Sequence, residues 1–405
     1  MGNTLYMNPA TAPPAPGAVG ENIALQRKAK GWSQQALAHR ASISKSLLSK
    51  IEVGDRACRP AVAAALAGAL GIPLPVLYGQ PYAESPAPDL IDALRAAVRR
   101  HRHPRVSEVR PDALPADVAA ASKLRAGTNY RRLLPVLPDL IARAVAHAHD
   151  SGEPEAWQML VDAYSCAYTL AHRLGYPDLA DVVAARQEWA AHQTWTPVAQ
   201  LAAAWTESGT HQSAGDYLEG LAVVDRALAA AGAAGAGSVD AVVATGSLHL
   251  RGVTLAARAR DDATTQHHLR HARRLAETLP PGDHYRHNLT FGPGNVALHE
   301  LATHVELERP RRAVAMAQGL AGAALPGLAP TRIGHLHIDA ARAHLAAGDR
   351  DAALYSLLQA REVAPQMARI HPMAREVLRV LVSLHRRSKP ELSILAKWAG
   401  LHQAP

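Results

Sequence analysis

From residue 89 onward, the sequence is typical of a long series of helices that prolines and glycines separate. Alanine and leucine supply most of the 48% hydrophobic residues, whereas aromatic residues make up 4% and include one phenylalanine, Phe291. Good helix formers dominate, and the aromatic and β-branched residues that favour strands are scarce, which argues against an all-β or doubly wound fold. Consecutive helix pairs of this kind predict an all-α protein with an α-solenoid body.

The clearest repeat covers Arg332–Pro365 and fits a 34-residue tetratricopeptide unit. In this register Ala353 and Ala360 occupy the small positions where paired helices touch, and Gly348 lies in the turn between them. The repeat is degenerate, because its consensus large positions hold His337, His344 and Leu357. Weaker helix pairs are predicted at 115–150, 153–192, 197–231, 240–279, 293–325 and 371–401.

The net charge of +8 is concentrated near the N-terminus. Residues 1–82 carry eight lysines and arginines against three acidic residues, whereas residues 113–405 carry 29 against 27. A basic module joined to a nearly neutral body indicates contact with a polyanion, although a solvated basic face is the simpler alternative.

The segment Ser33–Glu52 has the pattern of two short helices joined by a tight turn. Ser33 and Ser44 are expected N-caps, and Leu47, Leu48 and Ile51 fall on the buried face of the second helix. In a helix-turn-helix arrangement the second helix lies in the DNA major groove. Its outward side chains are donors suited to guanine edges or phosphates, namely Lys45, Ser46, Ser49 and Lys50.

Gly20–Tyr78 resembles the Cro/C1-type helix-turn-helix of the xenobiotic-response-element family, to which lambda repressor belongs. The matching residues are Arg27, Ser33-Gln34, Leu37-Ala38, Ile43-Ser44, Leu48–Glu52, Gly54, Arg59-Pro60, Leu66-Ala67 and Leu70-Gly71. The resemblance implies that Gln34 contacts the DNA backbone, and that Lys45, Ser46 and Lys50 reach base edges or nearby phosphates. The DNA-contact set expected from pattern and resemblance together is Gln34, Ser44, Lys45, Ser46, Ser49, Lys50, Arg56 and Arg59.

The same resemblance implies a partly buried ion pair between Arg27 and Glu52, which gives these two residues a structural role. For Arg56 and Arg59, in the loop after the second helix, a solvated loop is as good an explanation as a phosphate contact. Ser42 stands where the family usually has glycine, so the backbone there is strained if it still needs a positive φ.

Phe291–Glu300, residues 341–362 and His371–Gly400 are similar to the C-terminal region of large actinobacterial regulators of this family, whose helices are tetratricopeptide-like. The resemblance implies a body that dimerises and receives a signal. Peptide-pheromone receptors of Gram-positive bacteria have a comparable architecture, with a peptide on the concave face. We therefore expect a disordered tail at 1–17, a DNA-binding head at 18–80, a linker and connecting helix at 81–112, and a helical dimerisation and sensor domain at 113–405.

Four tryptophans near the middle of the body, together with Asn295, are candidate ligand-binding residues. Aromatic side chains on neighbouring solenoid helices can line a groove, although they more often fill the core, and Asn295 can equally be a helix cap. The tryptophans concerned are Trp157, Trp189, Trp195 and Trp205.

No catalytic or metal site is predicted. His299 and His304 are five residues apart, which puts their imidazoles roughly 140° apart on a helix, and His267 and His271 share a face without an evident third ligand. Two cysteines, Cys58 and Cys166, are too few for a disulfide framework. A redox-sensing role for Cys58 is kept as an alternative hypothesis. We expect no cofactor, no membrane span and no signal peptide, and hence a cytoplasmic protein.

Together these features predict a transcriptional regulator that binds double-stranded DNA as a homodimer on an inverted-repeat operator. Its helical body is expected to receive a peptide, small-molecule or small protein signal. The alternative is a solenoid interaction protein, antitoxin-like or a scaffold, that works mainly through a small protein partner.

Overall fold

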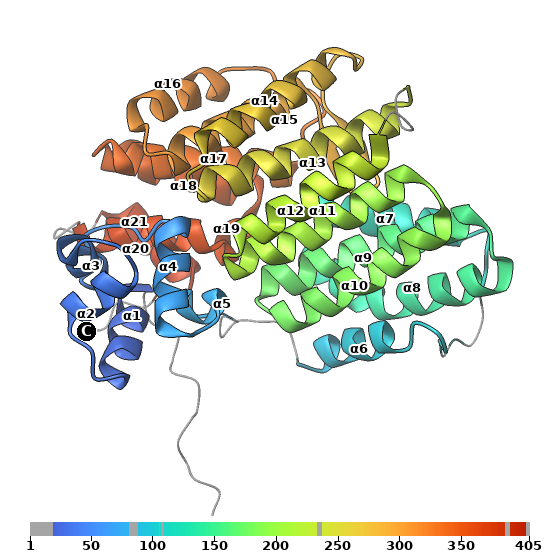
Figure 1. The fold of residues 1–405 in the computed structure, drawn as a ribbon, viewed down its shortest axis with the longest axis horizontal. Helices are drawn as coiled ribbons and strands as arrows, with labels where there is room; N and C mark the ends of the chain where they lie inside the picture. The colour runs from blue at the N-terminus through green and yellow to red at the C-terminus, as the bar shows by residue number, and fades with distance from the viewer. Residues whose placement is uncertain are drawn as a thin grey trace, which may run out of the picture.

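The computed structural model describes residues 19–80, 88–104, 106, 109–232, 237–384 and 389–401. In this part of the chain the protein is almost entirely helical, with an N-terminal head followed by a helical repeat-like body (Figure 1). The all-α prediction is therefore confirmed. The predicted tail at 1–17 and the start of the predicted linker, 81–87, lie outside the described residues.

The head consists of five short helices: α1 (Val19–Ala29), α2 (Gln34–Arg40), α3 (Lys45–Glu52), α4 (Pro60–Leu70) and α5 (Leu74–Leu77). The two predicted N-caps are present, because Ser33 Oγ accepts from the N–H of Ala36 and Ser44 Oγ accepts from the N–H of Leu47, both at 3.1 Å. All five helices contribute side chains to a common buried core that includes Ile23, Leu37, Leu48, Ile51, Leu66, Leu70 and Leu77.

The body begins with α6 (Pro88–Arg99), which packs on α8 and α10 through Ile91, Leu94 and Val98. The helices that follow are α7 (Leu114–Ala126), α8 (Tyr130–Ser151), α9 (Pro154–Leu174), α10 (Pro177–Thr194), α11 (Pro197–Ala214), α12 (Tyr217–Ala231), α13 (Val239–Arg258), α14 (Asp262–Glu277), α15 (Pro293–Glu306), α16 (Pro310–Ala321), α17 (Pro330–Ala346), α18 (Arg350–Val363), α19 (Pro365–Ile370), α20 (Pro372–Leu384) and α21 (Pro390–Trp398).

Each body helix from α7 to α18 packs on its successor, and the odd-numbered helices also pack on one another, α7 on α9 and so on to α17. This second set of contacts makes the odd-numbered helices one continuous row. Small residues allow the close approach, because a Cβ at Gly209 of α11 would lie 2.2 Å from Tyr168 Oη of α9. In the predicted repeat, α17 and α18 form the pair, Ala353 and Ala360 are fully buried, and Gly348 has φ +87° in the turn.

A short antiparallel hairpin interrupts the series between α14 and α15, where the sequence did not indicate strands. Strand β1 (His284–Arg286) pairs with β2 (Leu289–Phe291) in the register His284 to Phe291. The two turn residues, His287 and Asn288, have φ values of +47° and +61°, as a type I′ turn requires. Phe291 is fully buried against Gly246 of α13, so the hairpin is part of the core.

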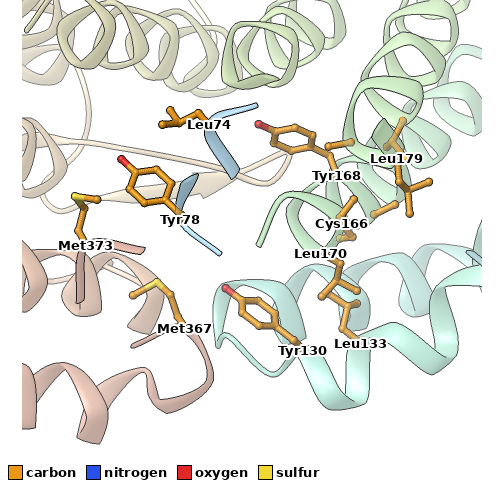
Figure 2. Close-up of a cluster of buried hydrophobic side chains, with 14 of the residues drawn as sticks. Leu74, Tyr78, Tyr130, Leu133, Cys166, Tyr168, Leu170, Leu179, Met367 and Met373 are labelled. Atoms are coloured by element: carbon orange, nitrogen blue, oxygen red, sulfur yellow. The ribbon is translucent and has the colours of Figure 1, made fainter. Parts of the chain in front are cut away.

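The row of helices curves back on itself, so that its last members contact its first ones. Helix α19 packs on α9, and Gln366 Oε1 accepts a 3.0 Å hydrogen bond from the backbone N–H of Arg131 in α8. The head closes the arrangement, with α5 against α11 and with α20 and α21 beside the head (Figure 1). Figure 2 shows the result, with Tyr78, Tyr168 and Met367 from three separate parts of the chain around one interior region.

Candidate DNA-binding surface and inner face of the body

The outward side of α3 carries the predicted base-reading side chains. Lys45, Ser46 and Lys50 are exposed, whereas Ser49 is half-buried. The hydroxyl of Ser44 is used as the cap of α3, which fixes where the helix starts and leaves Lys45 and Ser46 in its first turn. The N-terminal end of the helix is the part that reaches base edges in this kind of domain.

Arg27 and Glu52 form a bidentate ion pair that ties α1 to the end of α3. Arg27 Nε and Nη2 donate to the two carboxylate oxygens of Glu52 at 2.7 and 2.8 Å, and Arg27 Nη1 donates to Trp32 O. Burial raises the pKa of Glu52, but hydrogen bonds from Arg27 and Gln34 outweigh it and hold this pKa below its ordinary value. The pair fixes the orientation of α3 in the head.

Gln34 lies half-buried next to this pair, because its Nε2 donates to Glu52 Oε2 at 2.8 Å. The side chain for which a DNA-backbone contact was expected therefore also supports the ion pair. Ser42 has φ +53°, so the backbone keeps the left-handed turn although the residue is not glycine. A feature that the sequence reasoning missed is Arg40, whose guanidinium lies 4.4 Å from the ring centroid of Trp32, a cation–π contact.

The two arginines of the loop after α3, for which phosphate contacts were predicted, have different surroundings. Arg56 is exposed, but Arg59 is half-buried and forms an ion pair with Glu308 of the body. The guanidinium of Arg59 therefore faces the body in this structure, and its phosphate contact stays a prediction. The spacing alone gave no signal of this, since Glu308 is far away in the sequence.

Two further hydrogen bonds join the same loop and α4 to the body. The backbone N–H of Cys58 donates to Glu376 Oε1 at 2.8 Å, and Tyr217 Oη donates to Pro60 O at 3.1 Å. The Cys58 side chain is fully buried, and burial raises its thiol pKa well above the ordinary value. A buried, protonated thiol packs as a small hydrophobic group, which argues against a redox role for Cys58.

The predicted ligand-binding residues do not form one site. Trp157 is buried and meets Trp189 edge to face at 5.2 Å, with His149 beside both, which is a packed cluster between helices. Trp195 is 86% exposed. The groove that the sequence suggested for these three tryptophans is therefore not formed.

Trp205 and Asn295 differ from these three, because each contacts an arginine of the odd-numbered row. The guanidinium of Arg251 stacks on Trp205 at 4.1 Å from the ring centroid, and Arg332 Nε donates to Asn295 Oδ1 at 2.8 Å. Asn295 also donates to Thr290 O at 2.6 Å, so it links the hairpin to α17.

Of the histidines considered from sequence, His267 is exposed and its ring centroid lies 4.5 Å from that of the half-buried His271. His299 and His304 are both half-buried. A buried pair that the sequence did not indicate is His249 and His268, which meet Nδ1 to Nδ1 at 3.0 Å. Among the residues that the structure describes, no group of three or more His, Cys, Asp or Glu side chains is arranged to hold a metal ion. In the same described part of the chain, no helix is long and apolar enough to cross a membrane.

Comparison with known proteins agrees for the head. Residues 23–77 match the helix-turn-helix family model. The head is thus a helix-turn-helix domain, the kind of domain that binds DNA through its second helix. No curated protein matches the chain.

Two solved structures show weak similarity over most of the chain. The crystal structure of a PrgX/iCF10 complex has 8% identity and a TM-score of 0.27, with 86% of this chain and 90% of that chain covered. A PrgX mutant with a tyrosine-to-cysteine substitution has 9% identity and a TM-score of 0.23, with 86% and 95% covered. At these values the similarity says nothing about function.

Proposed function

We propose that the protein is a sequence-specific transcriptional regulator whose head reads double-stranded DNA and whose helical body controls the head. The observation that carries this proposal is the exposed outer side of α3, where Lys45 and Ser46 lie in the capped first turn and Lys50 in the last turn, all three accessible to a major groove. Other elements of the head, namely the 54–59 loop, α4 and α5, contact the body. Its role is binding rather than catalysis.

The proposed functional unit is a homodimer on an inverted repeat. Specific DNA interfaces bury about 1,000–2,500 Å² of protein surface, more than a single short head supplies. Two heads on one operator meet this requirement, and the body is the part large enough to hold two chains together. The body in turn receives a peptide, small-molecule or small protein signal.

The test begins with selection of bound sequences from a random duplex pool by the full chain, followed by fluorescence anisotropy at several salt concentrations. We expect one enriched inverted repeat and an affinity that falls steeply with salt. Lys45→Ala and Lys50→Ala should each weaken binding and shift the preferred bases. Lys123→Ala, an exposed lysine on α7, is the matched control and should leave both unchanged.

If no sequence is enriched from the random duplex pool, the proposal of sequence-specific binding is wrong. A loss of affinity that is equal for every sequence would assign Lys45 and Lys50 to phosphates instead of bases. Sedimentation of the selected complex tests the homodimer, since one chain per operator contradicts it.

A further inference from the structure

Three arginines of the body lie on its inner face without an acidic partner. They are Arg173 at the end of α9, Arg251 in α13 and Arg332 at the start of α17, and we call them the central cationic cluster. Within the described part of the chain, none of the three forms an ion pair with a carboxylate. Closure of the helix row brings them together, since Arg173 Nη2 lies 2.9 Å from His335 Nε2 of α17.

All hydrogen-bond partners of these guanidiniums are neutral. Arg251 Nη1 donates to Gln212 Oε1 at 2.6 Å while its plane stacks on Trp205. Arg332 Nε donates to Asn295 Oδ1, and its Nη2 lies 3.4 Å from His299 Nδ1. These contacts orient the guanidiniums, but they leave three positive charges uncompensated.

The nearest carboxylates are already used. Arg342 binds Glu306 at 3.0 Å and Asp339 at 2.9 Å, and Arg258 Nε lies 3.6 Å from Glu306. Asp283 accepts hydrogen bonds from the backbone N–H groups of Gly294 and Asn295. None of these carboxylates forms an ion pair with the cluster, although the charges of Asp339 and Asp283 act on Arg332 from a distance.

The three arginines are half-buried, so each keeps part of its surface accessible to solvent. Burial lowers the pKa of Arg251 to about 10, and Arg173 lowers it further by charge repulsion. Burial likewise lowers the pKa of Arg332 to about 10, where the charge of Asp339 opposes this shift and the charges of Arg173 and Arg251 add to it. At neutral pH, Arg251 and Arg332 therefore remain charged in a poorly solvated place.

The neighbouring histidines do not add charge. Burial, followed by the charge of Arg173, lowers the pKa of His172 to about 3, and burial with Arg332 does the same for His299. Burial also lowers the pKa of His335 and of His371 well below the ordinary value. At neutral pH these rings therefore serve as neutral hydrogen-bonding groups around a fixed positive charge.

We propose that the central cationic cluster is the binding site for an anionic effector, and that its guanidiniums bind a carboxylate or phosphate group of that effector. Unpaired buried cations are costly, and a guanidinium forms bidentate, charge-assisted hydrogen bonds with both kinds of anion. The inference rests on the proposed function, because it names the chemistry of the signal that the body receives. It assigns Trp205 and Asn295 as positioning residues for Arg251 and Arg332.

The test measures thermal unfolding of the full chain without DNA, at constant ionic strength, in chloride, inorganic phosphate or citrate. We expect phosphate or citrate to raise the Tm of the wild type relative to chloride, because an anion that binds the folded state stabilises it. Arg251→Gln and Arg332→Gln should remove at least half of this rise. Arg226→Gln on the exposed side of α12 is the control and should keep it.

The source of the anion is distinguished with a second pair of probes, N-acetyl-(Ala-Gly)₃ with a free or an amidated C-terminus. Stabilisation by the free acid but not by the amide, with no effect of phosphate or citrate, indicates a peptide carboxylate. Stabilisation by phosphate or citrate alone indicates a small-molecule anion. The absence of any effect beyond chloride, or an equal effect in all variants, overturns the proposal.

Isothermal titration of citrate and phosphate into wild-type protein gives a readout that does not depend on how the variants fold. One binding event per chain is expected for citrate, phosphate or, in a third titration, the free-acid peptide. Absence of detectable binding of all three up to millimolar concentration contradicts the site. Lys50→Ala separates this inference from the proposed function, because it should lose DNA affinity and keep the anion effect. If the selected DNA is bound normally while no anion binds, only the inference about the cluster fails.

Discussion

The backbone N–H of Cys58 donates a 2.8 Å hydrogen bond to Oε1 of Glu376, a residue 318 positions further along the chain. This contact joins the loop directly after α3 to α20, one of the last helices of the body. Burial raises the pKa of Glu376, and the hydrogen bond from Cys58 lowers it in part. This hydrogen bond is therefore one buried contact through which a change in the position of α20 reaches the loop that follows α3.

Removal of the acceptor should release this part of the head. Glu376→Ala leaves the buried N–H of Cys58 without a partner, which costs about 1–3 kcal/mol. Glu376→Gln keeps a carbonyl oxygen at the same place and should cost less. Urea unfolding of the full chain measures both, with Glu391→Ala on the exposed side of α21 as the control. Equal losses for the two Glu376 variants would show that the charge, rather than the hydrogen bond, matters.

The pKa of the Glu52 carboxyl is lower in the folded protein than its ordinary value of 4.5 in the unfolded chain. The Arg27–Glu52 pair should therefore stabilise the head fully at pH values above 4.5. As pH falls through the folded-state pKa, this contribution should be lost. Loss of one partner from a buried pair costs about 3–5 kcal/mol, so Arg27→Met should be strongly destabilising. The double variant Arg27→Met with Glu52→Met should be less destabilised than Arg27→Met alone, because it leaves no unpaired buried charge.

Unfolding at pH 7 and pH 4 followed by circular dichroism measures both effects, and the four proteins form a double-mutant cycle. Glu52→Gln should show a smaller loss on acidification than the wild type. Strict additivity of the two single substitutions would contradict direct coupling between Arg27 and Glu52.

The head could be predicted from sequence because its determinants are local. Ser33 and Ser44 cap helices a few residues away, and Leu48 and Ile51 follow the spacing of one helix face. The pairing of α17 with α18 was predicted for the same reason, since Ala353, Ala360 and Gly348 lie within one repeat.

The features that were missed depend on the way the helix row closes. Arg59 meets Glu308, and Arg173 meets His335, only because distant helices come together, and no local pattern encodes either contact. The β1–β2 hairpin was missed because it is three residues per strand and lies between two long helices. The tryptophans were grouped by closeness in sequence, whereas Trp195 and Trp205 point to different surroundings.

The buried histidine pair predicts acid sensitivity. Burial, together with the charges of His268 and His271, lowers the pKa of His249 to about 3, and burial lowers that of His268 to about 4 despite Asp225 nearby. Below pH 6.5 the unfolded chain binds protons that the folded protein does not, so stability falls with pH. Each ring should account for about 1–2 kcal/mol by pH 5.

Thermal unfolding between pH 7.5 and pH 5 measures this slope. The double variant His249→Asn with His268→Asn is expected to be less stable at pH 7.5 and to lose less on acidification than the wild type. His192→Asn, on the exposed side of α10, should keep the wild-type slope. A slope that is identical in all three proteins would assign the acid sensitivity to other groups.

Two helical glycines should respond with opposite sign to the same substitution. A Cβ on Gly246 of α13 would lie 2.2 Å from Cζ of the fully buried Phe291, whereas a Cβ on Gly319 of α16 meets nothing within 4 Å. Alanine favours a helix over glycine by about 1 kcal/mol, so Gly319→Ala should raise stability by up to that amount. Gly246→Ala should instead lower it by about 1–3 kcal/mol, because the ring of Phe291 cannot move away without disturbing the hairpin. Urea unfolding measures both, and Phe291→Leu combined with Gly246→Ala should recover part of the loss if the ring is the cause. A stabilised Gly246→Ala would mean that the hairpin does not pack on α13 as described.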